Sequence, residues 1–95
     1  MSEYDYKIKL SPEEIERFCE QFTEYQTLTE NNQVHIRFLL NNIIKTYNGE
    51  QEPGGFVKAV LENNFSKAVT KADLTTFKCI KLFACFVSMH IPDNE

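Results

Sequence analysis

The sequence predicts an all-α domain: a compact bundle of about four helices, preceded by an extended N-terminal arm that is a candidate β segment. Three observations favour this class. Apolar residues recur at spacings of three and four along most of the chain, which is the period of an amphipathic helix. Only three Gly and three Pro occur in 95 residues, too few for the turns of a many-stranded sheet. Strict apolar–polar alternation is confined to YDYKIKL, residues 4–10.

Length and composition correspond to a single globular domain, residues 1–95. The chain is 42% apolar and 25% charged, with a net charge of −4, close to an average domain. Because binding to nucleic acid generally requires a basic surplus, direct nucleic-acid binding is not expected. The most apolar run, LFACFV, has six residues, whereas a membrane span needs about 20. We therefore expect no membrane association, and the charged N-terminus predicts no signal peptide.

The arm, residues 1–10, is expected to be extended because its residues alternate. No other segment alternates over a comparable length. The arm therefore either packs along its own domain or pairs with a second chain, most simply its own copy across a two-fold axis. A homo-oligomer, such as a dimer, would involve the apolar arm residues and two phenylalanines of the last helix: Tyr4, Tyr6, Ile8, Leu10, Phe83 and Phe86.

Helices are expected at 12–27 and 32–47. The first begins with SPEE, in which Ser11 can cap the helix, Pro12 suits its first position and Glu14 completes a capping box. The second ends at an Asn-Gly pair, since Gly49 can adopt the left-handed conformation that closes many helices.

Two further helices are expected at 55–72 and 74–90, after the linker EQEPGG. Asp73 is a suitable cap for the fourth helix. That helix is apolar almost all round. Such a helix is typically the central element of a small domain, or also forms the surface of an oligomer.

A polar face is expected on the third helix. At 100° per residue, Asn63 lies opposite the apolar core stripe and Asn64 at its edge. The candidate binding face consists of the residues around this pair: Phe56, Asn63, Asn64, Lys67 and Lys71. Its donors suit an anion or an acidic partner surface. The alternative interpretation is an ordinary solvated edge.

A row of carboxylates is expected along the outer side of the first helix, formed by Glu13, Glu16, Glu20 and Glu24. Such a row either keeps the domain soluble or imitates nucleic-acid phosphates in a basic groove of another protein. Both interpretations remain open.

No catalytic, cofactor or metal site is expected. Residues 49–54 have the G-x-x-x-x-G spacing of a phosphate loop but lack the Lys-Ser or Lys-Thr that follows it. Cys19, Cys79 and Cys85 are expected to be reduced and buried, and no C-x-x-C or H-x-x-x-H pattern occurs. His35 lies between apolar positions and is interpreted as structural. We therefore expect that the protein is not an enzyme.

The segment PGGFVKAVLENNFSKAVTKAD, residues 53–73, resembles a motif in a family of short bacteriophage and prophage proteins without an assigned activity. Residues that fit are Pro53, Gly54, Gly55, Phe56, Ala59, Val60, Leu61, Asn63, Asn64, Ala68, Ala72 and Asp73. Val57, Phe65 and Lys71 depart from it. The resemblance implies a phage-like origin and expression in the bacterial cytoplasm. It carries over no catalytic residue.

The expected function is that of a phage-type accessory protein that binds a host protein without catalysis. An inhibitor of a host defence or regulatory factor would fit. The alternative is an oligomeric module that binds or sequesters a small anionic ligand or nucleotide through the lysines of the third and fourth helices. A component of the virion is a third candidate.

Overall fold

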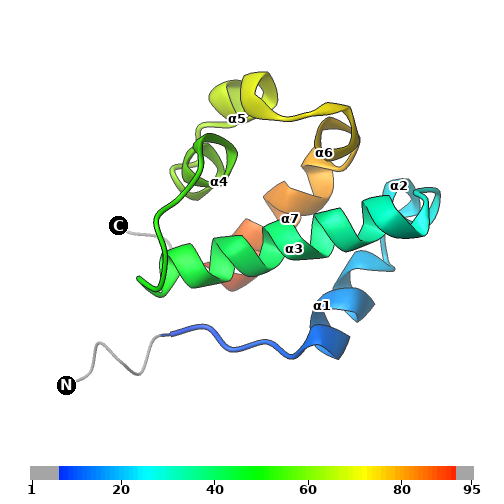
Figure 1. The fold of residues 1–95 in the computed structure, drawn as a ribbon, viewed down its shortest axis with the longest axis horizontal. Coiled ribbons are helices and arrows are strands. Elements are labelled where there is room, and N and C mark those ends of the chain that lie inside the picture. The colour runs from blue at the N-terminus through cyan, green and yellow to red at the C-terminus, as the bar shows by residue number, and fades with distance from the viewer. Residues whose placement is uncertain (1–6, 92–95) are drawn as a thin grey trace.

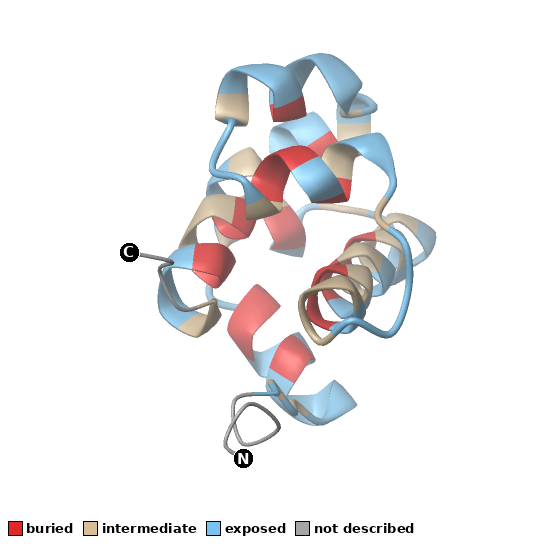
Figure 2. Cartoon of the chain, turned by 90° about the vertical axis from the view of Figure 1, so that its left-hand side faces the viewer, coloured by how far each residue is buried: buried red, intermediate tan, exposed pale blue. Residues whose placement is uncertain are grey.

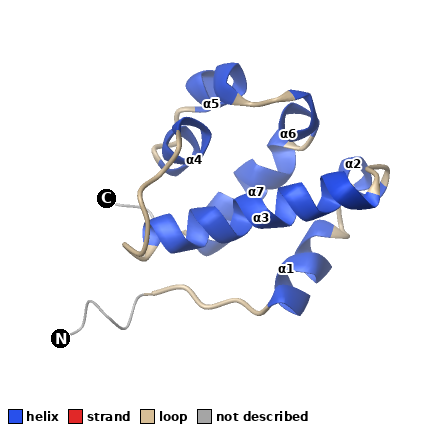
Figure 3. Ribbon diagram, in the orientation of Figure 1, coloured by secondary structure: helices blue, strands red, loops and turns tan. Residues whose placement is uncertain are grey.

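The structure, a computed structural model, describes residues 7–91 and folds this part of the chain into seven helices (Figure 1). Their bounds are α1 Pro12–Cys19, α2 Thr23–Gln26, α3 Glu30–Tyr47, α4 Gly55–Leu61, α5 Phe65–Lys71, α6 Leu74–Lys78 and α7 Ile80–His90. No strand occurs among these residues (Figure 3). The all-α class is confirmed. The count of about four helices is not, because three of the expected helices are each divided in two.

Two predicted helix caps and one predicted helix end are confirmed. Ser11 accepts a hydrogen bond from the Glu14 N–H while the Glu14 side chain accepts from the Ser11 N–H, which is the expected capping box. Asp73 caps α6. Gly49 has φ 80° directly after α3. These predictions are correct because each feature depends on only a few neighbouring residues.

The helix expected at 12–27 is broken between α1 and α2. Phe22 adopts an extended conformation, and its ring packs against that of Phe18 with 5.2 Å between centroids. The Gln26 side chain donates a hydrogen bond to the Glu20 carbonyl at the end of α1. A side chain from the second helix thus satisfies a backbone acceptor that the break leaves free.

The third expected helix is broken at the asparagine pair. Asn63 has φ 61°, the one positive φ at a non-glycine residue within 7–91. Its N–H donates to Val60 at 3.0 Å, and the Asn64 N–H donates to Ala59 at 2.8 Å, which is a Schellman closure of α4. The Asn64 side chain then accepts from the Lys67 N–H at 3.2 Å and caps α5. The asparagines therefore end one helix and begin the next, instead of sharing a face of a continuous helix.

The last expected helix, 74–90, is divided into α6 and α7 at Cys79, which has φ −105° and ψ 22°. Helix α3 crosses the molecule, with α1 on one side and α4 on the other (Figure 1). Helix α4 also packs against α5 and α7, and α6 packs against α7. The buried faces of the helices turn toward one another (Figure 2). None of the helices within 7–91 combines the length and apolarity that a membrane span needs.

The core is built mainly from branched aliphatic and aromatic side chains. Its members that are at most 1% exposed are Ile15, Cys19, Tyr25, Ile36, Leu40, Ile43, Ala59, Val60, Ala68, Cys79, Leu82, Phe83 and Phe86. The presence of Phe83 and Phe86 in this set corrects the expectation that they form a self-association surface. Both are 0% exposed within a single chain, so neither offers surface to a second copy.

The described part of the arm lies along its own domain. The Ile8 N–H donates to the Asn48 side-chain oxygen, and the Asn48 side-chain nitrogen donates to the Ile8 carbonyl, both at 2.9 Å. The side chains of Ile8 and Leu10 pack against the core. Residues 7–10 are thus extended but pair with an amide side chain instead of a strand. Tyr4 and Tyr6 lie outside the described residues.

Candidate interaction surfaces

The five residues of the predicted binding face do not form one face. Phe56 is half-buried, and its ring meets that of Phe83 edge-on, with 5.1 Å between centroids. It belongs to the core. Lys67 and Lys71 are exposed on α5, and the alkyl chain of Lys71 lies over the start of α4, 3.4 Å from where a Cβ on Gly55 would be. The break after α4 redirects α5, so positions on the two helices do not follow one helical wheel.

The predicted carboxylate row is shorter than expected. Glu13, Glu16 and Glu20 are exposed along α1, where they line an open depression together with Arg17. Glu24 lies beyond the break, on α2, and is partly buried. Three carboxylates beside one guanidinium make a weaker imitation of a phosphate backbone than four in a continuous row.

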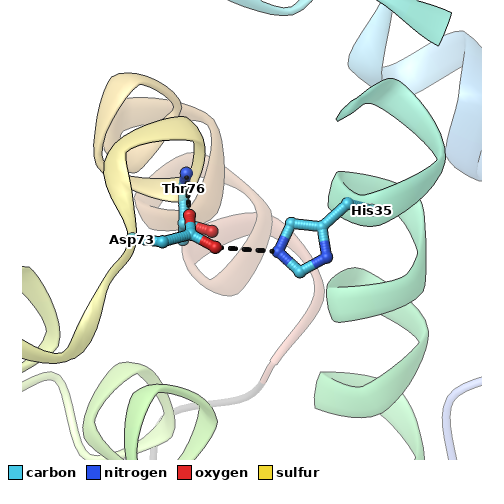
Figure 4. Close-up of polar contacts among 3 residues, drawn as sticks. All are labelled: His35, Asp73 and Thr76. Carbon is cyan, nitrogen blue, oxygen red and sulfur yellow. Dashed lines mark hydrogen bonds and ion pairs between the residues drawn. The ribbon is translucent and has the colours of Figure 1, made fainter. Parts of the chain in front are cut away.

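A polar contact ties α3 to the start of α6 (Figure 4). One carboxylate oxygen of Asp73 accepts from the Thr76 N–H at 2.8 Å, and the other lies 3.3 Å from His35 Nε2. The hydrogen bond from the Thr76 backbone, with a smaller contribution from His35, lowers the pKa of Asp73 below its ordinary value. The side chains of His35 and Asp73 are 40% and 59% exposed. This is a structural contact at the surface, not a sheltered acid–base pair.

Six large apolar side chains are exposed within residues 7–91: Val34, Phe38, Val69, Leu74, Phe77 and Met89. Four of them lie on α3 or α6, the two helices that the contact between His35 and Asp73 ties together. Val34 and Phe38 lie four residues apart on α3, and Leu74 and Phe77 three apart on α6, so each pair shares a helix face. We call these four residues the α3–α6 apolar surface.

This surface is unusual because of the size and exposure of its members. Leu74 is 70% exposed, Phe38 59%, and Val34 and Phe77 about half. Single exposed apolar residues are common, but a group of large ones is typical of an interaction site. The sequence analysis missed it. Val34 and Phe38 lie on the side of α3 opposite to buried Ile36, and this pattern could have been read from the sequence. The contact that joins α3 to α6 could not, because His35 and Asp73 are far apart in the chain.

The helices next to this surface are basic. Residues 64–91 contain four exposed lysines: Lys67, Lys71, Lys78 and Lys81. Asp73 is the one acidic residue in this range, and His35 and Thr76 already contact its carboxylate. The acidic residues of α1 lie on a different element. The described chain therefore has separate basic and acidic regions, although its net charge is negative.

The core encloses one tyrosine and two cysteine side chains. Tyr25 is 1% exposed, and its hydroxyl accepts a hydrogen bond from Arg37. Burial raises the pKa of Cys19 to about 12 and that of Cys79 to about 11. Both thiols are therefore protonated, and poor nucleophiles, at neutral pH.

Within residues 7–91, no group of three or more His, Cys, Asp and Glu side chains is placed to hold a metal ion. Comparison of the chain with protein-family models, curated proteins and solved structures gave no match. A functional proposal therefore depends on the surfaces described above.

Proposed function

We propose that this is a non-catalytic binding protein whose α3–α6 apolar surface docks onto another protein. The observation that carries the proposal is the exposure of Phe38, Leu74 and Phe77 on two helices joined by the contact between His35 and Asp73. Aromatic side chains at the centre of an interface often carry much of its binding free energy. Removal of one such anchor typically costs about 2 kcal/mol or more, or roughly 30-fold in Kd.

The partner chemistry follows from the neighbouring charges. Lys78 directly follows Phe77 at the end of α6, and Lys81 is in the first turn of α7. An apolar surface beside lysines is complementary to a partner that presents apolar side chains beside carboxylates. Such charge complementarity speeds association and selects the partner, and its effect decreases with salt.

The biological setting that we propose is a phage-type accessory role in the cytoplasm of a bacterial host, with a host defence or regulatory protein as the partner. This part of the proposal is supported by the sequence resemblance of residues 53–73 alone. Asn63 and Asn64, which belong to that motif, join α4 to α5, and Asp73 caps α6. In this chain the motif thus supports the position of the basic helices.

The experiment that tests the proposal is capture of a partner from bacterial lysate, followed by a titration of the purified partner. The double variant Phe38→Glu/Phe77→Glu should weaken binding by at least about 30-fold, because each glutamate adds a charge where an apolar anchor would be buried. Met89→Glu is a control for the addition of a surface charge, since Met89 is 67% exposed near the end of α7 and lies outside the proposed surface. Circular dichroism would confirm that all variants are folded.

Two results would overturn the proposal. One is a partner that binds wild type and Phe38→Glu/Phe77→Glu equally well, particularly if Glu13→Lys/Glu16→Lys abolishes binding, because that pattern would place the interface on α1. The other is a concentration-dependent dimer in light scattering that the Phe38→Glu/Phe77→Glu change dissociates. In that case a second copy of the chain, not a different protein, occupies the surface.

A further inference from the structure

A cleft of about 420 Å³ lies between the arm and the C-terminal half of α3. Its volume is in the range of small-molecule sites. We propose that this cleft binds a small organic anion, with a phosphate or similar group held by lysines and an apolar body held against the core. The site uses none of the residues of the α3–α6 apolar surface, so it stands independently of the proposed function.

Three lysines supply the charge. Lys7 and Lys9 lie on the arm, two residues apart, and both line the cleft. Lys45 lines the cleft from α3. None of the three forms an ion pair with a carboxylate of residues 7–91, and Glu50 is the one acidic residue in the lining. The cleft is therefore locally cationic in a chain whose net charge is −4.

The backbone of the arm, which forms one wall of the cleft, is held in place by hydrogen bonds. The two hydrogen bonds between Asn48 and the backbone of Ile8 hold the arm to the end of α3. A few residues later, the capping box of Ser11 fixes the chain at the start of α1. Because the arm is held at both points, little ordering is required on binding, which favours affinity.

The apolar side chains that line the cleft indicate that the ligand also has an apolar group. Ile8, Leu10 and Ile44 all line the cleft, and all three pack in or against the core. This apolar surface offers no hydrogen bonds to replace the hydration shell of an ion such as inorganic phosphate. It suits an aromatic or aliphatic group attached to the anion.

The test is a calorimetric or NMR titration of the full chain with phenyl phosphate, inorganic phosphate and phenol. Phenyl phosphate combines both features, and each of the other two probes carries one. We expect phenyl phosphate to bind with a submillimolar Kd, at least tenfold more tightly than either other probe, and its affinity to decrease with salt. Absence of saturable phenyl phosphate binding at several millimolar would overturn the site. If inorganic phosphate binds with the same Kd as phenyl phosphate, the proposed role of the apolar side chains is wrong.

Variants locate the site. Lys9→Gln/Lys45→Gln should weaken phenyl phosphate binding at least tenfold. Lys67→Gln/Lys71→Gln removes the same charge from α5 and should change the Kd by less than twofold. If both double variants weaken binding equally, the effect comes from net charge and the cleft is not the site. Chemical-shift changes at the Ile44 and Lys45 amides provide a readout that does not depend on the substitutions, and their absence in a saturated sample would also contradict the proposal.

Discussion

Three asparagines act on the backbone at positions where a helix or an extended segment ends, by forming hydrogen bonds to it or by changing its direction. Asn48 supplies both hydrogen bonds to Ile8 that a neighbouring strand would otherwise make. Asn63 adopts a left-handed conformation, and Asn64 caps the helix that follows. The short amide side chain is suited to all three tasks, since it bonds to nearby backbone and tolerates a positive φ.

The conformation of Asn63 leads to the first prediction. A β-branched residue is strained at positive φ, so Asn63→Val should destabilise the protein by about 1–2 kcal/mol. Asn63→Gly should change stability by less than about 0.5 kcal/mol, because Gly adopts this conformation freely. Asn63 is exposed, so differences in side-chain packing should contribute little to the stability difference between the two variants. Urea unfolding measures both values, and equal stabilities of the two variants would contradict the left-handed turn.

The second prediction concerns the carboxylate of Asp73. Asp73→Ala should cost about 1 kcal/mol at pH 7, since the cap of α6 is lost, whereas Asp73→Asn retains the cap. The pKa of Asp73 is lowered from its ordinary 3.8 in the folded state. Its ionic contribution is therefore present above about pH 4 and is lost as pH falls through the lowered pKa.

Urea unfolding from pH 7 to pH 2 checks this dependence. The stability difference between wild type and Asp73→Asn should shrink as the pH falls below about 4 and through the lowered pKa of Asp73, because protonation makes the aspartate neutral, as asparagine is. A difference that stays constant or grows toward low pH would contradict the sign of the pKa shift.

The third prediction uses the different burial of the cysteines. All three are free thiols, with Cys19 and Cys79 buried and Cys85 partly exposed. Iodoacetamide at pH 8 should therefore modify Cys85 first in the native protein, and all three thiols only after unfolding in urea. Mass spectrometry of the digested protein identifies the modified sites. Modification of Cys19 before Cys85 would mean that the α1 side of the core opens readily.

At the scale of the elements, the sequence predicts helix starts better than helix breaks. The caps at Ser11 and Asp73 and the left-handed Gly49 depend on residues within one turn, and all three are as expected. The break between α1 and α2, in contrast, involves a group from the next helix. A glutamine from α2 bonds to the end of α1, and this partner cannot be seen in the apolar period of a helix.

The same limit applies to the candidate sites. The exposed carboxylates of α1 and lysines of α5 are read correctly as surface residues because charged side chains rarely occupy a core. The placement of Phe56 and Phe83 in contact with each other required the packing of α4 on α7. The contact between His35 and Asp73 joins α3 to the start of α6. The sequence around either residue does not predict it.

The fourth prediction concerns how the arm attaches to α3. Asn48→Ala removes both hydrogen bonds to Ile8 and should destabilise the protein by about 1–2 kcal/mol. It should also increase the amide hydrogen exchange of Ile8. Asn41→Ala is the control, because the Asn41 side chain is exposed and bonds only within α3, to the Arg37 carbonyl. Unchanged exchange at Ile8 in Asn48→Ala would mean that apolar packing alone holds the arm.

At the scale of the whole molecule, charge and apolar exposure are both unevenly distributed. The exposed carboxylates Glu13, Glu16 and Glu20 lie on α1 and its C-cap, and the exposed lysines of residues 64–91 lie on α5 to α7. Four of the six large exposed apolar side chains of residues 7–91 lie on α3 and α6. Their presence beside lysines is the feature that a binding role explains.

The most direct test of this account is amide hydrogen exchange of the protein in complex with a purified partner. The docking proposal predicts increased protection on α6 and along the Val34–Phe38 turn of α3, with unchanged exchange across Glu13–Glu20 of α1. Protection confined to α1, or a bound complex in which the α3 and α6 amides exchange as in the free protein, would contradict it.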